Sequence, residues 1–264
     1  NKSEKLVGKC LFIAQKRSKF ADMTEIKRDI NVPETSFFLF GPRGTGKSTF
    51  IKRLIDNNTL YIDFLDPETF RTYAAFPETL LKTVNAVNPV RVIIDEVQKV
   101  PQILDVVHKL IEDKKIIFIL TGSGARKLKK TGADLLGGRA VYCRMHPFTA
   151  HELGTAFSLD KALLTGLIPV VERSIDPART LSAYVDIYLR EEIMAEGLVR
   201  NLGTFTRFLE IISYSHGAVL NVSNLARECQ ISRGIVSGYI DILEDLLLAY
   251  QLPVFARRAK RKTA

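Results

Sequence analysis

The sequence has few residues of the types that build disulfide frameworks and metal centres. Its three cysteines, Cys10, Cys143 and Cys229, are widely separated and form no Cys-x-x-Cys pair. The four histidines form no cluster with metal-ligand spacing. A few scattered thiols are typical of a reducing compartment, so we expect a cytoplasmic protein without structural zinc or disulfide bonds.

Long apolar runs are also missing. No stretch approaches the roughly 20 apolar residues that a membrane-spanning helix needs, and the basic N-terminus lacks the apolar core of a signal peptide. We therefore expect no membrane partner. Hydrophobic residues still make up 46% of the 264 residues, which is enough for a buried core and for two domains.

Excess positive charge is confined to the two ends of the chain. The formal net charge is +9, of which residues 1–30 carry +4 and residues 254–264 carry +5, so the residues between them balance to zero. Such a distribution favours local contacts with phosphate over a uniformly basic surface. Two solvated chain ends are the alternative interpretation.

Short apolar runs alternate with segments of helical spacing in the first half of the chain. The apolar runs are residues 36–40, 60–64, 91–95, 116–120 and, more weakly, 140–145. The helical segments are residues 48–57, 67–87 and 102–113. This alternation predicts an α/β fold with a mostly parallel sheet and helices on both faces.

The pattern changes near residue 150. Residues 151–200 have largely helical spacing, and three more helical segments follow, before a stretch with strand character at 248–255 and a basic tail. We therefore predict a basic N-terminal segment (1–34), an α/β core (35–150), a helical lid or linker (151–200) and a winged-helix-like domain (201–264).

The run Gly41-Pro-Arg-Gly-Thr-Gly-Lys-Ser48 matches G-x-x-x-x-G-K-[ST] between a predicted strand and a predicted helix. Glycines let successive backbone N–H groups converge on phosphate, at the positive end of the following helix. Lys47 is expected to reach the β- and γ-phosphates, and the Ser48 hydroxyl to bind Mg²⁺. The predicted nucleotide-binding residues are Gly41, Pro42, Arg43, Gly44, Thr45, Gly46, Lys47, Ser48 and Thr49.

An acidic pair ends the predicted strand at 91–95. Asp95 is expected at the carboxyl edge of the sheet, where ligands of open α/β sheets bind, and is our candidate for holding Mg²⁺ through water. Glu96 is placed to polarise the attacking water for in-line displacement at phosphorus. An Asp-Glu pair alone is often a solvated loop, but next to a phosphate loop it predicts ATP hydrolysis.

The predicted strand at 116–120 should lie between the first and third strands, so that its end faces the γ-phosphate. Thr121 or Ser123 would then hydrogen-bond the phosphate or the attacking water. A polar turn without a role in catalysis is an equally weighted alternative.

Five motifs, in this order, resemble a family of bacterial and archaeal AAA+-like ATPases. They are Gly-Pro-Arg-Gly-Thr-Gly-Lys-Ser-Thr (41–49), Ile-Ile-Asp-Glu-Val-Gln (93–98), Leu-Thr-Gly-Ser-Gly (120–124), Leu-Leu-Gly-Gly-Arg-Ala (135–140) and His-Pro-Phe-Thr-Ala-His-Glu-Leu (146–153). The resemblance covers about residues 35–255. It implies a winged helix after the ATPase core, and usually a further nuclease-like domain of unknown function, which this sequence does not include.

The resemblance also implies three roles. Ser123 is similar to the sensor position at the end of the fourth strand. Arg139 is similar to the arginine finger of AAA+ proteins, which acts on the nucleotide of a neighbouring subunit; a surface or ion-paired arginine is the alternative. Pro169 ends a Gly-x-x-Pro turn (166–169) that lies near the nucleotide base in this family.

Residues 221–244 have helix-turn-helix spacing. Leu225, Ala226 and Ile231 are expected to pack the first helix and the turn, and Ser232 to cap the second helix, whose buried stripe is Val236, Ile240 and Leu243. Acidic residues outnumber basic ones in this segment, which makes it a poor surface for a polyanion. Docking of the winged helix on the ATPase core or on a protein partner is therefore as good an interpretation as DNA binding. The candidate DNA contacts are Arg233, Ser237, Arg257, Arg258, Lys260, Arg261 and Lys262.

The leading hypothesis is a Mg²⁺-dependent ATPase that couples hydrolysis to conformational change, on DNA or as a homo-oligomer. The alternative is a nucleotide-gated switch or binding module with negligible turnover. A small-molecule kinase is a third and weaker interpretation, which the Asp-Glu pair and the winged-helix tail oppose. The sequence lacks the guanine-reading Asn-Lys-x-Asp motif, which favours ATP over GTP.

Overall fold

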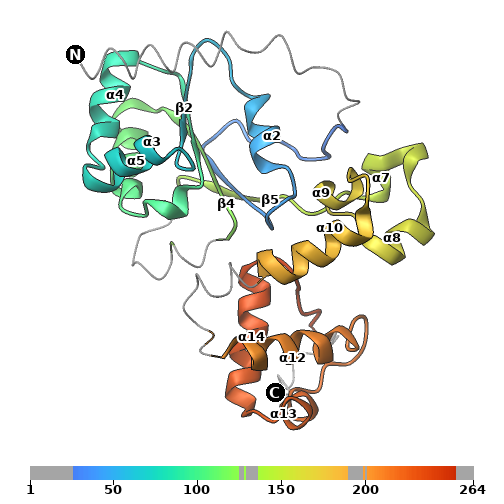
Figure 1. Ribbon diagram of the computed structural model, residues 1–264. Coiled ribbons are helices and arrows are strands. Elements are labelled where there is room, and N and C mark those ends of the chain that lie inside the picture. The colour runs from blue at the N-terminus through green and yellow to red at the C-terminus, as the bar shows by residue number, and fades with distance from the viewer. Residues whose placement is uncertain (1–25, 125–127, 129–135, 190–198, 200, 254–264) are drawn as a thin grey trace, which may run out of the picture. The chain divides into compact units, whose positions relative to one another are not determined.

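The computed structural model describes residues 26–253, apart from 125–127, 129–135, 190–198 and 200 (Figure 1). The chain divides into two compact units, residues 1–200 and residues 201–264, which are described separately below. None of the described helices is both long and apolar enough to cross a bilayer.

The first unit is built on a parallel sheet whose described strands follow the order β2-β3-β4-β1-β5. The strands are β1 (Phe37–Phe40), β2 (Thr59–Asp63), β3 (Arg91–Asp95), β4 (Ile117–Gly122) and β5 (Val141–Arg144). All five predicted strands are thus present. β4 lies between β1 and β3, as predicted, which brings the carboxyl ends of these three strands together.

Burial explains why the three central strands were the clearest in the sequence. Every residue of β1 is buried, as are all residues of β3 and β4 except the first of each. Strands covered on both faces are continuous apolar runs. β5 lies at the edge of the sheet and is mostly exposed, which accounts for its weaker apolar pattern.

Helices cover both faces of the sheet, with α2 on one side and α3, α4 and α5 on the other (Figure 1). Their bounds are α2 (Lys47–Lys52), α3 (Pro67–Ala75), α4 (Thr79–Val87) and α5 (Ile103–Lys114). The stretch of helical spacing predicted over 67–87 forms two helices, because the chain breaks at Phe76 between α3 and α4. Pro77 disfavours helical backbone in the residue before it, and Phe76 has φ −140° and ψ 78°.

The core on the α2 side consists of side chains from every second residue of β1, together with others from α2, β3, β4 and the end of β5. Its buried members are Phe37, Leu39, Phe50, Ile51, Ile93, Ile119 and Met145. This cluster packs the sheet against the helix that follows the phosphate loop, so burial of apolar surface holds that loop in place.

Short helices follow β5 within the first unit. They are α7 (Ala150–Leu153), η3 (Gly154–Ala156), α8 (Leu159–Thr165), α9 (Pro169–Glu172), α10 (Pro177–Ala183) and the π-helix η4 (Tyr184–Leu189). α7 begins with a capping box, in which Thr149 and Glu152 each accept a hydrogen bond from the other's backbone N–H.

The second unit contains α12 (Leu202–Ser213), α13 (Val222–Cys229) and α14 (Arg233–Asp245). An aromatic cluster joins α12 to α14, with the Tyr239 ring 4.9 Å from the ring of Phe205 and 5.2 Å from that of Phe208. The predicted cap on α14 is confirmed, since the Ser232 hydroxyl accepts from the Ile235 N–H at 3.4 Å.

The helix-turn-helix packing is largely as predicted. Five of the six residues predicted to pack the two helices and the turn are buried: Leu225, Ala226, Val236, Ile240 and Leu243. Ile231, in the turn, is only half-buried. The strand predicted over 248–255 is wrong for its described part, since residues 248–253 contain no strand. The rest of the predicted wing lies outside the described residues.

Candidate functional site

The loop between β1 and α2 curls around the side chain of its own lysine. Gly44 and Gly46 have φ +77° and +90°, a conformation that favours glycine. Lys47 is buried, and its ammonium donates to the carbonyls of Gly41 at 2.6 Å and Pro42 at 3.0 Å. The Thr45 hydroxyl also donates to the Pro42 carbonyl, at 2.7 Å. A buried cation inside a glycine-rich loop is the arrangement expected for binding phosphate.

Two neighbouring segments press against this loop. A Cβ atom on Gly41 would lie 2.2 Å from the carbonyl oxygen of Met145, just after β5. A Cβ atom on Gly44 would lie 2.8 Å from Cγ1 of Val170 in α9. Pro169, the first residue of α9, is buried beside Val170, so the predicted Gly-x-x-Pro turn lies against the phosphate loop. Its contact with a nucleotide base stays a prediction.

Asp95, the last residue of β3, is 1% exposed and accepts two hydrogen bonds. The Tyr61 hydroxyl donates to Oδ2 at 3.1 Å, and the Thr121 hydroxyl donates to Oδ1. Burial raises the pKa of Tyr61 above its ordinary value, and the negative charge of Asp95 raises it further. Tyr61 therefore stays protonated and can donate to the carboxylate. Thr121, one of our two candidates for contacting phosphate, is instead bonded to Asp95 here.

Glu96 occupies the left-handed region, with φ 60° and ψ 47°, which is uncommon for a residue with a side chain. Its N–H donates to the Thr121 hydroxyl at 3.2 Å, and its carboxylate accepts from the amide nitrogen of Gln98. Ser123 follows β4, is buried, and its hydroxyl lies 3.5 Å from the same amide nitrogen. The ends of β3 and β4 thus bring Asp95, Glu96 and Ser123 together. The Gly41 N–H donates to the Gly122 carbonyl at 3.4 Å, which joins this group to the phosphate loop.

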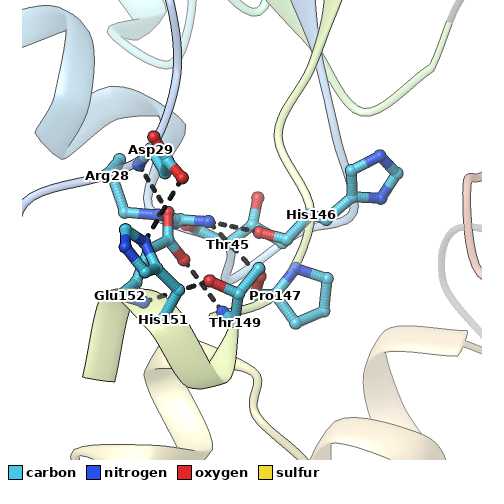
Figure 2. Close-up of polar contacts among 8 residues, drawn as sticks. All are labelled: Arg28, Asp29, Thr45, His146, Pro147, Thr149, His151 and Glu152. Carbon is cyan, nitrogen blue, oxygen red and sulfur yellow. Dashed lines mark hydrogen bonds and ion pairs between the residues drawn. The ribbon is translucent and has the colours of Figure 1, made fainter. Parts of the chain in front are cut away.

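A second layer holds the phosphate loop from the N-terminal side (Figure 2). Arg28, whose side chain is 7% exposed, donates to Glu152 at 2.9 Å and to the Thr45 carbonyl at 2.7 Å. It also donates to the carbonyls of His146, at 2.5 Å, and Pro147, at 3.4 Å. One guanidinium therefore connects the N-terminal segment, the phosphate loop and the segment after β5. Sequence reasoning missed this arginine, because no local pattern marks it.

Glu152 is the anion of this cluster, and its side chain is 3% exposed. Burial by itself raises the pKa of its carboxyl. Hydrogen bonds from the Asp29 N–H, Arg28 and the Thr149 N–H outweigh burial, so that the pKa lies below its ordinary value. Glu152 therefore remains a carboxylate at neutral pH. The exposed contact between His151 and Asp29, at 3.4 Å, borders the cluster in Figure 2.

Arg139 is found in the arrangement that we gave as the alternative to an arginine finger. It forms an ion pair with Glu112 of α5 and donates to the Gly137 carbonyl at 2.9 Å. The Glu112 pKa lies below its ordinary value, first because of the hydrogen bond from Arg139 and then because of its charge. Contact with a neighbouring subunit stays a prediction.

The candidate DNA contacts in the described residues are Arg233 and Ser237, both exposed on α14. The five basic residues of the tail, Arg257, Arg258, Lys260, Arg261 and Lys262, lie outside the described residues.

The donor set fits a magnesium nucleotide better than a metal held by protein alone. The described residues include no group of three or more His, Cys, Asp or Glu side chains that could hold a metal. Ser48, which follows Lys47, and Asp95, at the end of β3, are the two residues predicted to hold Mg²⁺. Mg²⁺ is usually bound by one or two protein oxygens together with phosphate and water, which suits so small a set.

This geometry agrees with a comparison against protein families. Residues 34–154 match the AAA domain family. The match supports a nucleotide-binding domain of the ATPase type over this segment. Residues 156–264 match a family described as a domain of unknown function, DUF8612. The AAA match ends just after α7, so the helices from α8 onward and the second unit fall under the other family.

No curated protein matches the sequence. Among solved structures, the chain is similar to the replication initiator DnaA bound to AMPPCP and single-stranded DNA. That likeness covers 80% of this chain and 82% of the other, with a TM-score of 0.35 and 11% identity.

Proposed function

We propose that the phosphate loop binds ATP with Mg²⁺ and that the AAA domain hydrolyses it to ADP and phosphate. The observation that carries this proposal is that Asp95, Glu96 and Ser123 meet at the ends of the adjacent strands β3 and β4, beside the glycine-shaped loop that holds Lys47. The loop N–H groups and Lys47 would hold the phosphates, while Ser48 and Asp95 would hold Mg²⁺. When bound, Mg²⁺ offsets negative charge on the phosphates.

Glu96 is the proposed general base. It would take a proton from a water molecule, whose oxygen attacks the γ-phosphorus as the bond to the β–γ bridging oxygen breaks and ADP leaves. Glu96 has its backbone N–H bonded to Thr121 and its carboxylate bonded to Gln98, so its position is set at two points. Ser123 is the proposed sensor of the γ-phosphate.

The coupling of hydrolysis to conformational change would run through the helices after β5. Gly44 packs against Val170 of α9, and the Tyr184 hydroxyl donates to the Arg43 carbonyl at 3.1 Å. A change in the conformation of the loop on binding or losing phosphate would therefore shift α9 and the start of η4. Arg139 of a second copy is the proposed finger, which would require it to leave Glu112.

A nucleotide-gated switch with negligible turnover is the second candidate. It is favoured by the ion pair between Arg139 and Glu112, because an arginine held within its own subunit is not available to the nucleotide of a neighbouring one. DNA binding by the second unit is not favoured by the charge of residues 221–246, which hold Arg227 and Arg233 against four acidic residues.

Steady-state ATP hydrolysis by wild type and by Glu96→Gln, with and without duplex DNA, tests the proposal. We expect wild type to turn over ATP, and Glu96→Gln to bind ATP with similar affinity but to lose turnover about 100-fold or more. Lys47→Ala is the companion variant, which should lose binding itself. Binding of ATP by wild type without turnover in any condition would favour the switch. Stimulation by DNA would add a DNA contact to the function.

A further inference from the structure

Gln98 joins the two polar groups that the proposed reaction needs, although neither sequence motif gave it a role. It lies in the 3₁₀ helix η2 (Val97–Lys99), directly after Glu96 and Val97. Its amide nitrogen donates to Glu96 Oε2 and lies 3.5 Å from the Ser123 hydroxyl. A single side-chain amide thus bridges the end of β3 and the end of β4.

The orientation of this amide is determined by its surroundings. A carboxylate accepts hydrogen bonds only, so the group facing Glu96 has to be the NH₂. The amide oxygen Oε1 then points at Gly122 and is buried without a hydrogen-bond partner among the described residues.

Gly122 leaves space for the side-chain amide of Gln98 and for the ring of Phe40. A Cβ atom at this position would lie 2.5 Å from Gln98 Oε1 and 3.3 Å from its Cδ, too close for both side chains to stay where they are. The backbone of Gly122 is extended strand, so conformational freedom does not explain the glycine. Each residue of the motif Thr-Gly-Ser at 121–123 therefore has a separate part. Thr121 donates a hydrogen bond to Asp95, Gly122 leaves space for the Gln98 side chain, and Ser123 places its hydroxyl near the Gln98 amide.

We propose that Gln98 is a positioning residue for hydrolysis, which orients the Glu96 carboxylate and links it to Ser123. The inference rests on the proposed function, because it assigns Gln98 to the same reaction. Gln98 acts through Glu96, and no contact of Gln98 with phosphate or with the attacking water is proposed. Whatever Ser123 binds then changes the hydrogen bonding of the Gln98 amide, and through it the position of the base.

The first test separates turnover from binding. We expect Gln98→Ala to lower kcat about 10- to 100-fold, the rate equivalent of losing one hydrogen bond to a charged group. The Kd for ATP should stay within about twofold, because Gln98 has no contact with the phosphate loop. The matched control is Gln102→Ala, which shortens an exposed glutamine four residues further on and should leave both constants unchanged.

The second test uses Gly122. Gly122→Ala should lower kcat in the same way, because its Cβ displaces the Gln98 amide from Glu96. In the double variant Gln98→Ala with Gly122→Ala the clash with the Gln98 amide is gone, and the edge of the Phe40 ring, 3.3 Å from the new Cβ, is the close neighbour that remains. The kcat of the double variant should therefore match that of Gln98→Ala alone. Losses that multiply would overturn the link, as would a Gln98→Ala enzyme with wild-type kcat.

The third test does not need turnover. The side-chain amide resonance of Gln98 in a ¹⁵N-labelled protein is assigned by its loss in Gln98→Ala, and it should shift in Glu96→Gln, Ser123→Ala and Gly122→Ala. If wild type does not hydrolyse ATP but the resonance shifts in all three, the proposed hydrolysis fails while the bridge stands. If wild type hydrolyses ATP but the resonance does not shift in Ser123→Ala or in Glu96→Gln, Gln98 does not bridge Glu96 and Ser123, and the hydrolytic function stands.

Discussion

Replacing Arg28 with alanine should destabilise the first unit strongly and weaken nucleotide binding. The substitution removes donors from the Glu152 carboxylate and from the carbonyls of Thr45, His146 and Pro147 in one step. It also removes the guanidinium that lies 4.9 Å from the centre of the Phe148 ring. The side chain is thus a junction of three chain segments, one of which is the phosphate loop.

The magnitude follows from burial. With side chains 7% and 3% exposed, Arg28 and Glu152 form a buried ion pair, and removing one partner of such a pair costs about 3–5 kcal/mol. Glu152 keeps the N–H donors of Asp29 at 2.7 Å and Thr149 at 2.9 Å, which places the cost near the lower end of this range. For a domain of this size each 1 kcal/mol lowers Tm by about 2–4 °C, so we expect a fall of about 6–12 °C.

Thermal unfolding followed by far-UV circular dichroism measures this fall, since the sequence has no tryptophan for intrinsic fluorescence. The control is His151→Ala, which removes the exposed contact to Asp29 in the same cluster and should change stability by less than about 1 kcal/mol. A fluorescent ATP analogue reports the affinity for nucleotide. This affinity should fall in Arg28→Ala, because the Thr45 carbonyl in the phosphate loop loses the hydrogen bond from Arg28. Equal Tm values for the two variants would refute the argument from burial.

Three further predictions concern Tyr61, Gly41 and Glu152. Tyr61→Phe removes a hydrogen bond to the buried Asp95 carboxylate and should lower the free energy of unfolding by about 1.5–3 kcal/mol; an unchanged urea midpoint would contradict this. Gly41→Ala places a Cβ atom 2.2 Å from the Met145 carbonyl oxygen, so ATP titration should detect a large loss of affinity. The pKa of Glu152 is lower in the folded protein than in the unfolded chain, so the ionised carboxylate stabilises the folded state. This contribution to the free energy of unfolding is complete above the unfolded pKa of about 4.3, and it is lost as the pH falls through the folded pKa. Glu152→Gln should therefore flatten the acid limb of the stability curve, measured by urea unfolding from pH 7 to pH 3.

Local pattern predicted much of the fold. The strands could be read from the sequence because residues buried on both faces of a sheet leave continuous apolar runs. The phosphate loop could be read because glycines, a lysine and a serine stand at fixed spacing between a strand and a helix. The break between α3 and α4 was also readable, since Pro77 restricts Phe76, although the prediction of helical spacing over 67–87 did not place it.

The contacts that hold the site in place were not readable. Tyr61 and Asp95 are 34 residues apart, and Arg28 and Glu152 are 124 residues apart. Gln98 stands inside a recognised motif, but its role depends on Gly122 and Ser123, which come from a different strand. Sequence periodicity carries no information about such pairs, because they are set by which strands become neighbours and by how far side chains reach.

The sequence by itself determined the elements, the order in which they follow and the residue types of the phosphate loop and the acidic pair, because each depends on neighbours within a few positions. Only the tertiary structure decided what surrounds those residues. The parallel order β3-β4-β1 brings Asp95, Gly122 and Gly41 to one edge of the sheet, and packing of the N-terminal segment places Arg28 on the loop. Hydrogen bonds between distant segments exist only once the chain has folded, and they set the orientation of the candidate site residues that were predicted from the sequence.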